Sequence, residues 1–317
     1  MLRKKLLLML LCLLPLVSLA QLMACRGFIK DGYDFWLYLP DDYETARVKK
    51  PVVLFLHGKS LCGEDLEMVR RYGCINALMR GREIDAVVIA PQAQGAWNPQ
   101  KLMDLFDWVK TYYRVDSNRL YVLGMSMGGY GTLDFVATYP NKVAAAMALC
   151  GGATVKSLCG LTEVPLWIIH GTADEAVPVR CSERVVDSMC SCGDTSRLLF
   201  DRLDKVNHTR LARIFYLERT YKWLFSHSLL DSARVLNKDY VITKETLGTA
   251  YDDLTENSSI KVIDAKYPTT KKYYLVKKGD TWSSIAVEHE TTVSILLKIN
   301  KMKKTDKLRV GKKIRVK

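Results

Sequence analysis

Histidine is scarce in this sequence, so few residues are available as metal ligands. Only five histidines occur in 317 residues, and none of them lies at metal-ligand spacing from a cysteine. We therefore expect no metal site, and we expect no cofactor. Long apolar runs are also scarce, because the run Leu6–Val17 is too short for a committed membrane span.

Most of the chain also lacks an excess of either charge, although its formal net charge is +13. Residues 271–317 hold fourteen Lys or Arg against four Asp or Glu, and Arg3, Lys4 and Lys5 supply the other three positive charges. Residues 6–270 are therefore formally neutral. The basic balance belongs to the two ends of the chain, and we expect no specific nucleic-acid partner.

Residues 1–20 have the pattern of a secretory signal peptide: a basic start, an apolar run and the small-residue ending Ser18-Leu19-Ala20. We predict cleavage before Gln21, which would export the protein to the periplasm, the cell surface or the medium without a transmembrane span. The alternative is an imperfect lipobox, Leu22-Met23-Ala24-Cys25, which would make the protein a lipoprotein through Cys25. Met23 at its second position makes this alternative weaker.

The cysteine content agrees with export. Eight cysteines lie outside the predicted signal, an even number that suits disulfides in an oxidising compartment. The local candidates are Cys150 with Cys159, and a pair within Cys181, Cys190 and Cys192. The competing interpretation is that several of them are buried free thiols, and the sequence does not assign the connectivity.

Strand-like and helix-like segments alternate along residues 21–228. Continuous apolar runs such as Pro51–Leu56 are typical of strands covered on both faces. The repeated alternation predicts an α/β fold with a doubly wound, mainly parallel sheet. The connection between the predicted strands Val143–Leu149 and Val164–Ile169 is short, so we expect no large lid. Single helices are expected over Glu64–Met79, Lys101–Tyr113 and Thr209–Phe225.

A serine between glycines connects a short apolar strand to a helix. Gly124-Met125-Ser126-Met127-Gly128 follows the predicted strand Leu120–Leu123 and precedes the predicted helix Thr132–Tyr139. A serine on so tight a turn is forced into a strained backbone and projects its hydroxyl from the sheet. The Met127 N–H, at a helix start, can face a developing oxyanion. This pattern resembles the nucleophile elbow of the α/β-hydrolase superfamily, especially secreted esterases of the feruloyl-esterase and polyhydroxybutyrate-depolymerase kind, over residues 28–227.

The resemblance implies a catalytic triad that begins with Ser126. His208 is selected as the base because it follows the last predicted strand, on the same sheet edge as the serine. Asp174 lies in His-Gly-Thr-Ala-Asp-Glu-Ala-Val-Pro, which is similar to the family's acid loop, and Ser-Asp-His is the superfamily's order. The alternatives are that Asp174 only caps a turn, or that Asp201 or Asp204 is the acid.

Two further loops are expected at this edge. The segment His57-Gly58-Lys59-Ser60 follows a strand, and the resemblance implies that the backbone of Lys59 or Ser60 supplies the second oxyanion-hole N–H. We interpret His57 as a structural histidine that orders this loop. Trp97 lies on a glycine-containing loop, where it could pack on a sugar ring or an aromatic acyl group at the substrate rim. A core-packing tryptophan is an equally supported interpretation.

The last residues, 273–317, have a different pattern. Gly279-Asp280-Thr281 forms a turn that caps a helix, a second helix follows, and a strand ends the chain. This segment resembles the LysM module, a small βααβ domain, which implies binding of N-acetylglucosamine-containing glycans such as peptidoglycan through Gly279, Asp280 and Thr281. Its lysines also suit an anionic wall polymer, or a solvated surface without a partner. Residues 229–272 lose periodicity and are predicted to be a partly ordered linker.

These predictions combine into a secreted serine esterase that acts on carbohydrate-linked feruloyl or acetyl esters and is held on a glycan by the terminal module. Ser126 would attack the ester while His208 takes its proton, in two acyl-transfer steps. Two alternatives stay open. One is a serine peptidase of the prolyl-oligopeptidase type, and the other is a glycan-binding protein with a non-catalytic hydrolase-like body.

Overall fold

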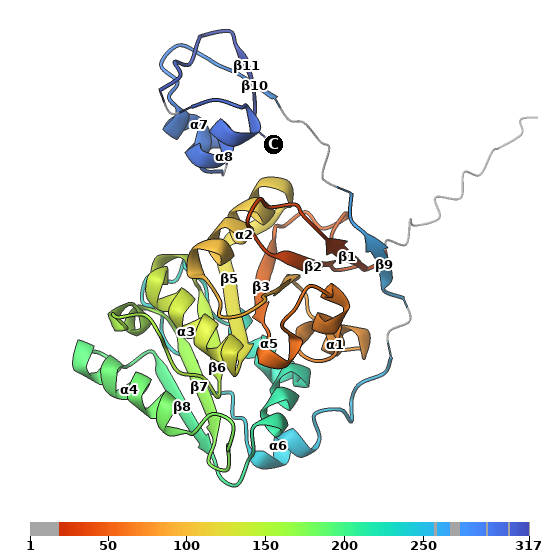
Figure 1. Ribbon diagram of the computed structural model, residues 1–317, viewed down its shortest axis with the longest axis vertical. Helices are drawn as coiled ribbons and strands as arrows, with labels where there is room; N and C mark the ends of the chain where they lie inside the picture. Colours follow the sequence, from red (N-terminus) through yellow and green to blue (C-terminus); the bar gives the residue numbers. More distant parts are fainter. Residues whose placement is uncertain (1–18, 257–258, 267–272, 290, 304, 317) are drawn as a thin grey trace, which may run out of the picture.

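The computed structural model describes residues 19–256, 259–266, 273–289, 291–303 and 305–316. Its main body is a sheet with the strand order β8-β7-β6-β5-β3-β4-β2-β1-β9, seen in Figure 1. Strands β3 to β8 are parallel to one another in this sheet, whereas β2 is antiparallel to both β4 and β1. The predicted α/β fold, with a mainly parallel sheet and no large lid, is confirmed. The strands are β1 Gln21–Cys25, β2 Asp34–Leu39, β3 Lys50–Leu56, β4 Val87–Gln92, β5 Val115–Met125, β6 Ala145–Leu149, β7 Leu166–Gly171, β8 Leu198–Leu203 and β9 Lys261–Asp264.

Helices cover both faces of this sheet, so its central strands are buried throughout. One apolar core contains residues of α1, η5, α5 and α6, and the other contains residues of α2, α3 and α4. Such two-sided cover explains the continuous apolar strands of the sequence. The helices are α1 Cys74–Met79, α2 Pro99–Tyr112, α3 Met127–Thr138, α4 Arg180–Cys192, α5 Glu218–Phe225 and α6 Lys244–Gly248. The 3₁₀ turns are η1 Lys59–Leu61, η2 Leu66–Arg70, η3 Pro140–Lys142, η4 Cys159–Glu163 and η5 Thr209–Tyr216.

Two of the expected helices are broken into shorter elements. The segment predicted as one helix over Glu64–Met79 is η2 followed by α1, and Gly73, at a positive φ of 85°, separates them. A Cβ at Gly73 would lie 2.0 Å from the ring of Phe55, so the chain turns there to pack closely on β3. The expected helix Thr209–Phe225 is likewise η5 and then α5.

The segment 229–272, predicted to be a partly ordered linker, is more ordered than the sequence indicates. Leu236, Ile242 and Leu247 are buried in the same core as η5 and α5. Strand β9 then pairs in parallel with β1 and extends the sheet. Most of this segment therefore belongs to the main body, and residues 267–272 lie outside the described residues.

The start of the described chain bears on the two predicted processing sites. Residues 1–18 lie outside the described residues, so cleavage before Gln21 stays a prediction. Cys25 is fully buried at the end of β1, which pairs with β2 on one side and β9 on the other. Lipidation of Cys25 would remove the rest of β1 and expose a buried thiol, so this structure disfavours the lipoprotein alternative. In the described part of the chain, every helix is too short or too polar to span a bilayer.

The terminal segment forms the expected βααβ unit. Strands β10 Tyr273–Leu275 and β11 Lys313–Arg315 pair antiparallel, and helices α7 Trp282–Glu288 and α8 Val293–Ile299 lie between them in the sequence. It has a small core of its own, which includes Ile285, Leu296 and Ile314. Thr281 caps α7 and Thr292 caps α8. The hydroxyl of each accepts the backbone N–H of the residue three positions ahead.

A disulfide joins Cys159, at the start of η4, to Cys192, at the end of α4. The expected pairing of Cys150 with Cys159 is wrong, because Cys150 is a buried free thiol at the end of β6. A pair within Cys181, Cys190 and Cys192 is also wrong. Cys181 and Cys190 share α4 and lie about 13 Å apart along it, beyond disulfide reach.

Replacing both Cys159 and Cys192 by serine should lower the free energy of unfolding by about 3–4 kcal/mol, because the bond closes a loop with a sequence separation of 33 residues. Urea unfolding of the oxidised protein and the variant measures this loss. Cys190→Ser, which changes an exposed free thiol on the same helix, is the matched control and should change the free energy by less than about 0.5 kcal/mol. Equal stabilities of the double variant and the control would contradict the prediction.

Candidate active site

Ser126 occupies a strained turn between β5 and α3. Its φ is 59° and its ψ is −123°, a conformation that few residues other than glycine adopt. Its N–H donates to the Leu149 carbonyl at 2.9 Å, and its carbonyl accepts from the Tyr130 N–H at 3.0 Å. These two bonds hold the turn at both ends, so Ser126 is fixed at the carboxyl end of β5 as the sequence predicts.

The two glycines of the motif allow the close approach that this turn needs. A Cβ at Gly128 would lie 1.9 Å from the Leu56 carbonyl oxygen, and one at Gly124 would lie 2.4 Å from the Gly128 carbonyl oxygen. Neither position can hold a side chain without moving the backbone. The start of α3 therefore packs directly against the end of β3.

The register of the parallel strands brings the candidate residues to one edge of the sheet. Leu56 of β3 pairs with Gly124 of β5, Met125 pairs with Leu149 of β6, and Leu149 pairs with Ile169 of β7. Ser126, Asp174 and His208 follow strands β5, β7 and β8, so all three lie beyond the carboxyl ends of parallel strands. This is the edge at which open α/β sheets bind their ligands.

Asp174 and His208 form a direct hydrogen-bonded pair. The His208 Nδ1 lies 2.7 Å from the Asp174 Oδ2, and Asp174 is buried. The other carboxylate oxygen, Oδ1, accepts the N–H groups of Ala176 and Val177 at 3.0 and 2.8 Å. Asp174 thus fixes the His208 ring through Nδ1, which leaves Nε2 as the nitrogen that can take a proton.

The two competing acids are engaged elsewhere. Asp201 accepts the Trp167 Nε1–H at 2.8 Å, and Asp204 accepts the Thr172 hydroxyl at 3.4 Å. The side-chain oxygen of Asn207, directly before His208, accepts the Arg210 N–H at 3.0 Å. That bond supports the turn that presents His208.

The loop after β3 offers unpaired backbone donors. The N–H groups of Lys59 and Ser60 make no hydrogen bond with another described residue, and neither does that of Met127 at the start of α3. A Cβ at Gly58 would lie 3.4 Å from the Ser126 Cβ, so this loop approaches the serine closely. Met127 with Lys59 or Ser60 can therefore form the predicted pair of oxyanion donors, and the choice between the latter two stays open.

His57 is a buried structural histidine, as we interpreted it. Its Nδ1 lies 2.8 Å from the Gly58 carbonyl, and its Nε2 accepts the Ala93 N–H at 3.0 Å. Burial lowers the pKa of His57 to about 4, so the ring is neutral at pH 7. It ties the loop after β3 to the loop after β4 and does not face the reacting atoms.

Trp97 does not lie on the substrate rim, so its core-packing interpretation is the correct one. Its side chain is only 6% exposed, its Nε1–H donates to the His57 carbonyl at 3.2 Å, and its ring meets the rings of His57 and Tyr33 edge to face. A Cβ at Gly131 of α3 would lie 2.5 Å from Trp97. Trp97 therefore supports the loop after β3 through the backbone of His57.

Cys150 is the residue of this site that sequence reasoning missed. It ends β6 at a positive φ of 40°, is fully buried, and has its Sγ within 4.8 Å of a ligand atom of both Asp174 and His208. Burial and the Asp174 carboxylate raise the pKa of this thiol well above its usual range, and the Ser126 backbone lowers it. Cys150 therefore remains a protonated thiol and connects the serine turn to the acid. The sequence feature that could have identified Cys150 is its position directly after a predicted strand, at the same sheet edge as Ser126.

Cys150, Asp174 and His208 have side chains of the types that bind transition metals. Metal binding needs a thiolate and a free imidazole nitrogen. The raised pKa of Cys150 disfavours the first, and the short Asp174–His208 bond occupies one nitrogen of the ring. The arrangement fits an acid–base group better than a metal centre.

The predicted glycan-binding residues lie together in the terminal domain and hold its first turn. Gly279 adopts a positive φ of 95°, the Asp280 carboxylate accepts the Lys277 N–H at 2.7 Å, and the Thr281 hydroxyl accepts the Ser284 N–H at 3.0 Å. All three therefore shape the backbone of this turn. A role in binding a glycan stays a prediction.

Comparison with known families agrees with this division of the chain. Residues 86–216 match the phospholipase/carboxylesterase family, and residues 274–317 match the LysM domain. The chain is therefore similar to the phospholipase/carboxylesterase family over its central residues and to the LysM domain over its last residues. The match to the first family includes Ser126, Asp174 and His208.

Curated relatives match short parts of the chain. The bifunctional acetylxylan esterase/xylanase XynS20E of Neocallimastix patriciarum is 34% identical over 85 residues, which are 26% of this chain and 12% of that protein. Acetylxylan esterase A of Emericella nidulans is 39% identical over 57 residues, 18% of this chain and 19% of that protein. The chain therefore spans less than a fifth of the length of these relatives. The crystal structure of a thermostable esterase covers 66% of this chain and 63% of its own with a TM-score of 0.54 and 24% identity, and it shows the same fold.

Cys150→Ala should lower kcat for ester hydrolysis roughly tenfold without changing KM, because it removes a thiol that faces the Asp174 carboxylate. Cys150→Ser, which restores a donor, should recover most of this loss. Steady-state kinetics on a p-nitrophenyl ester measures both effects.

Cys74→Ala is the matched control for this pair of variants. Cys74 is also a fully buried free thiol, but it lies in α1 beside the Tyr221 hydroxyl, on another part of the body. Its loss should lower stability and leave kcat unchanged. The positioning role is refuted if Cys150→Ser is as slow as Cys150→Ala while both variants are folded.

Proposed function

We propose that this protein is a serine hydrolase that cleaves carboxylic esters, with Ser126, His208 and Asp174 as its catalytic triad. The observation that carries the proposal is the 2.7 Å Asp174–His208 pair at the same sheet edge as a serine held at a φ of 59°. A strained nucleophile, an oriented base and unpaired backbone donors are the three parts that acyl transfer requires.

The proposed reaction has two acyl-transfer steps. Ser126 Oγ attacks the ester carbonyl carbon while His208 Nε2 takes its proton, and the Asp174 carboxylate stabilises the resulting imidazolium through Nδ1. The imidazolium then protonates the leaving alcohol oxygen as the C–O bond breaks. In the second step His208 takes a proton from water, the resulting hydroxide attacks the acyl-serine carbonyl, and the imidazolium returns the proton to Ser126 Oγ as the acid leaves. The N–H groups of Met127 and of Lys59 or Ser60 stabilise the negative oxygen in both steps.

Among esters, those linked to carbohydrate are the proposed substrates. Both acetylxylan esterase relatives carry that activity in their names, and the LysM domain implies that the protein works on glycan surfaces. The short connection between β6 and β7 leaves the site without a large lid, which suits soluble or polymeric esters. A peptidase of the prolyl-oligopeptidase type, or a non-catalytic glycan-binding protein, remains the alternative.

Ser126→Ala and His208→Ala should each lower kcat for p-nitrophenyl acetate by at least about 10³-fold, because they remove the nucleophile or its base. Asp174→Asn should lower kcat by about 10⁴-fold through loss of the correct His208 tautomer. A fluorophosphonate probe should label the wild-type protein and leave Ser126→Ala unlabelled.

Asp201→Asn is the control for the carboxylate variants, because Asp201 is a nearby acid that contacts Trp167 instead of His208. It should keep activity within about threefold of the wild type. Full activity of Ser126→Ala or His208→Ala would remove the triad assignment. Hydrolysis of amide but not ester substrates would favour the peptidase alternative.

The LysM domain is proposed to hold the protein on N-acetylglucosamine-containing glycans, with Gly279, Asp280 and Thr281 in its binding groove. Export is part of this proposal. The Cys159–Cys192 disulfide agrees with an oxidising compartment, and a wall glycan is an extracytoplasmic target.

The full-length protein should sediment with insoluble peptidoglycan, and soluble N-acetylglucosamine oligomers should release most of it, because they compete for the groove. Activity left in the supernatant measures the unbound fraction. Concentrated sodium chloride should release only a minor part. If salt releases the protein and the oligomers do not, binding is due to the basic surface of residues 271–317 and the glycan assignment is wrong.

A further inference from the structure

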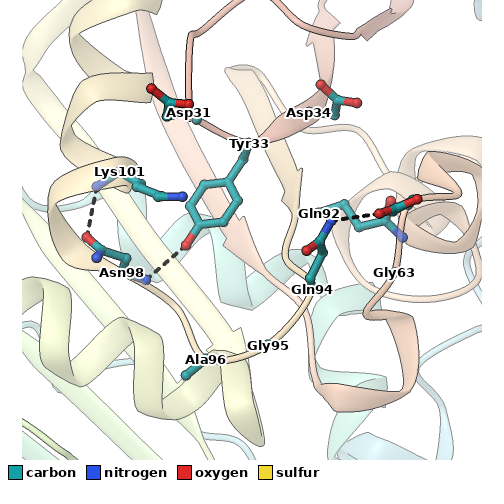
Figure 2. A pocket seen from close by; sticks show the side chains of 12 residues that line it. Asp31, Tyr33, Asp34, Gly63, Gln92, Gln94, Gly95, Ala96, Asn98 and Lys101 are labelled. Atoms are coloured by element: carbon teal, nitrogen blue, oxygen red, sulfur yellow. Dashed lines mark hydrogen bonds between the residues drawn. The ribbon is translucent and has the colours of Figure 1, made fainter.

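A polar cavity of about 570 Å³ lies at the carboxyl ends of β3 and β4, the sheet edge that also carries the proposed active site. Its lining comes from the loop before β2, the loop after β3 and the loop after β4. Figure 2 shows the Tyr33 ring projecting into it, with Lys101 and Asn98 on one side and Gln94 on the other. Its volume is in the range of pockets that bind small ligands.

The cavity presents an aromatic face together with polar groups that the protein leaves available. The Tyr33 hydroxyl accepts the Asn98 N–H at 2.9 Å, which fixes the ring and leaves its O–H free to donate. The Lys101 ammonium lies 5.8 Å from the ring centroid and forms no ion pair with a described residue. The Asp31 carboxylate, also in the lining, has no hydrogen-bond partner among the described residues. The Asp34 carboxylate accepts the Gly27 N–H at 2.7 Å. An aromatic face with unused donors and acceptors around it is suited to a sugar ring, which has apolar C–H faces and a rim of hydroxyls.

The cavity is connected to the nucleophile through the oxyanion loop. Gly63 lines it, and the Sγ of the preceding residue, Cys62, lies 3.8 Å from the Sδ of Met127. The Gly63 N–H also donates to the Ala93 carbonyl at 3.1 Å, which joins the loops after β3 and β4. Only β3 separates β4 from β5 in the sheet, so the cavity lies about two strand spacings, or about 10 Å, from the Ser126 strand. A glycan whose ester oxygen reaches Ser126 can place a neighbouring sugar unit there.

The charges around the cavity restrict which sugar it can hold. Asp31, Asp34 and Glu64 lie in its lining, against the single cation of Lys101. The excess of carboxylates disfavours an acidic ligand such as a uronic acid or a phosphate, and sugar hydroxyls can donate to these same carboxylates. A neutral sugar is therefore the matching ligand.

We propose that this cavity is a subsite for a neutral sugar unit on the alcohol side of the ester, with Tyr33 as its stacking platform. The proposal rests on the proposed ester hydrolysis and adds its substrate class: an ester of a neutral oligosaccharide. Trp97 supports this platform from below, because its ring lies edge to face with Tyr33 at 5.2 Å.

Kinetics on two esters tests the subsite. Tyr33→Ala should raise KM for an acetylated neutral xylo-oligosaccharide about tenfold and leave kcat and the kinetics on p-nitrophenyl acetate unchanged, because the small ester does not reach the cavity. Tyr33→Phe, which keeps the ring, is the matched control and should stay within about threefold of the wild type. A second variant, Gly95→Tyr, adds a bulky side chain to the cavity lining and keeps Tyr33. A Cβ at Gly95 meets no atom within 4 Å, so the backbone there accepts a side chain, and the variant should raise the same KM.

Binding separates failure of the subsite from failure of the proposed function. The unesterified xylo-oligosaccharide should bind Ser126→Ala protein in calorimetry, and Gly95→Tyr in the same background should abolish that binding. Binding that persists in the double variant, or equal losses on both esters in Tyr33→Ala and Gly95→Tyr, would overturn the subsite. Absence of ester hydrolysis by the wild type, with oligosaccharide binding retained, would instead overturn the proposed function and leave the sugar subsite standing.

Discussion

The close approach of α3 to the end of β3 is the constraint on which the candidate site depends. It requires residues without side chains at 124 and 128, because a Cβ at Gly128 would lie 1.9 Å from the Leu56 carbonyl oxygen. That approach forces the residue between them into a positive φ and turns the serine hydroxyl away from the sheet. It also places the first N–H groups of α3 beside the loop after β3. That loop carries the N–H groups of Lys59 and Ser60, which have no hydrogen-bond partner among the described residues. One contact between two backbones thus positions both the nucleophile and the candidate oxyanion hole.

The parallel register extends this arrangement to the base and the acid. Strands β5 to β8 are paired so that their carboxyl ends lie at one edge, and residues of the loops after β7 and β8 contact each other there. Cys150 after β6 occupies the gap between Ser126 after β5 and Asp174 after β7. A small, protonated thiol fits there without adding a charge beside the carboxylate. The site is therefore a continuous row along one edge, and each member is held by a different strand.

The sequence was sufficient for the parts of this molecule that depend on local patterns. Ser126 and Asp174 lie in short motifs whose spacing defines a turn or a loop, and His208 followed from its place after the last strand of a parallel sheet. The parts it could not supply depend on distant neighbours. The role of Trp97 is decided by Gly131 and His57, and the partner of Cys159 is decided by where α4 ends. Strand β9 is mostly exposed and short, so its residues carry no apolar pattern, and only pairing with β1 makes them part of the sheet.

The two domains differ in charge, so they attract different ligands. The body is formally neutral over residues 6–270, and the cavity at the same sheet edge as its active site is lined by more carboxylates than ammonium groups. The terminal domain holds the excess of lysine and arginine, which attracts anionic polymers over about a Debye length. An anionic surface would therefore draw the protein in by its terminal domain, while the cavity would reject the acidic chains of that surface and accept neutral ones. Long-range attraction to an anionic surface and the choice of substrate then depend on opposite charges, so changing one by mutation leaves the other largely intact.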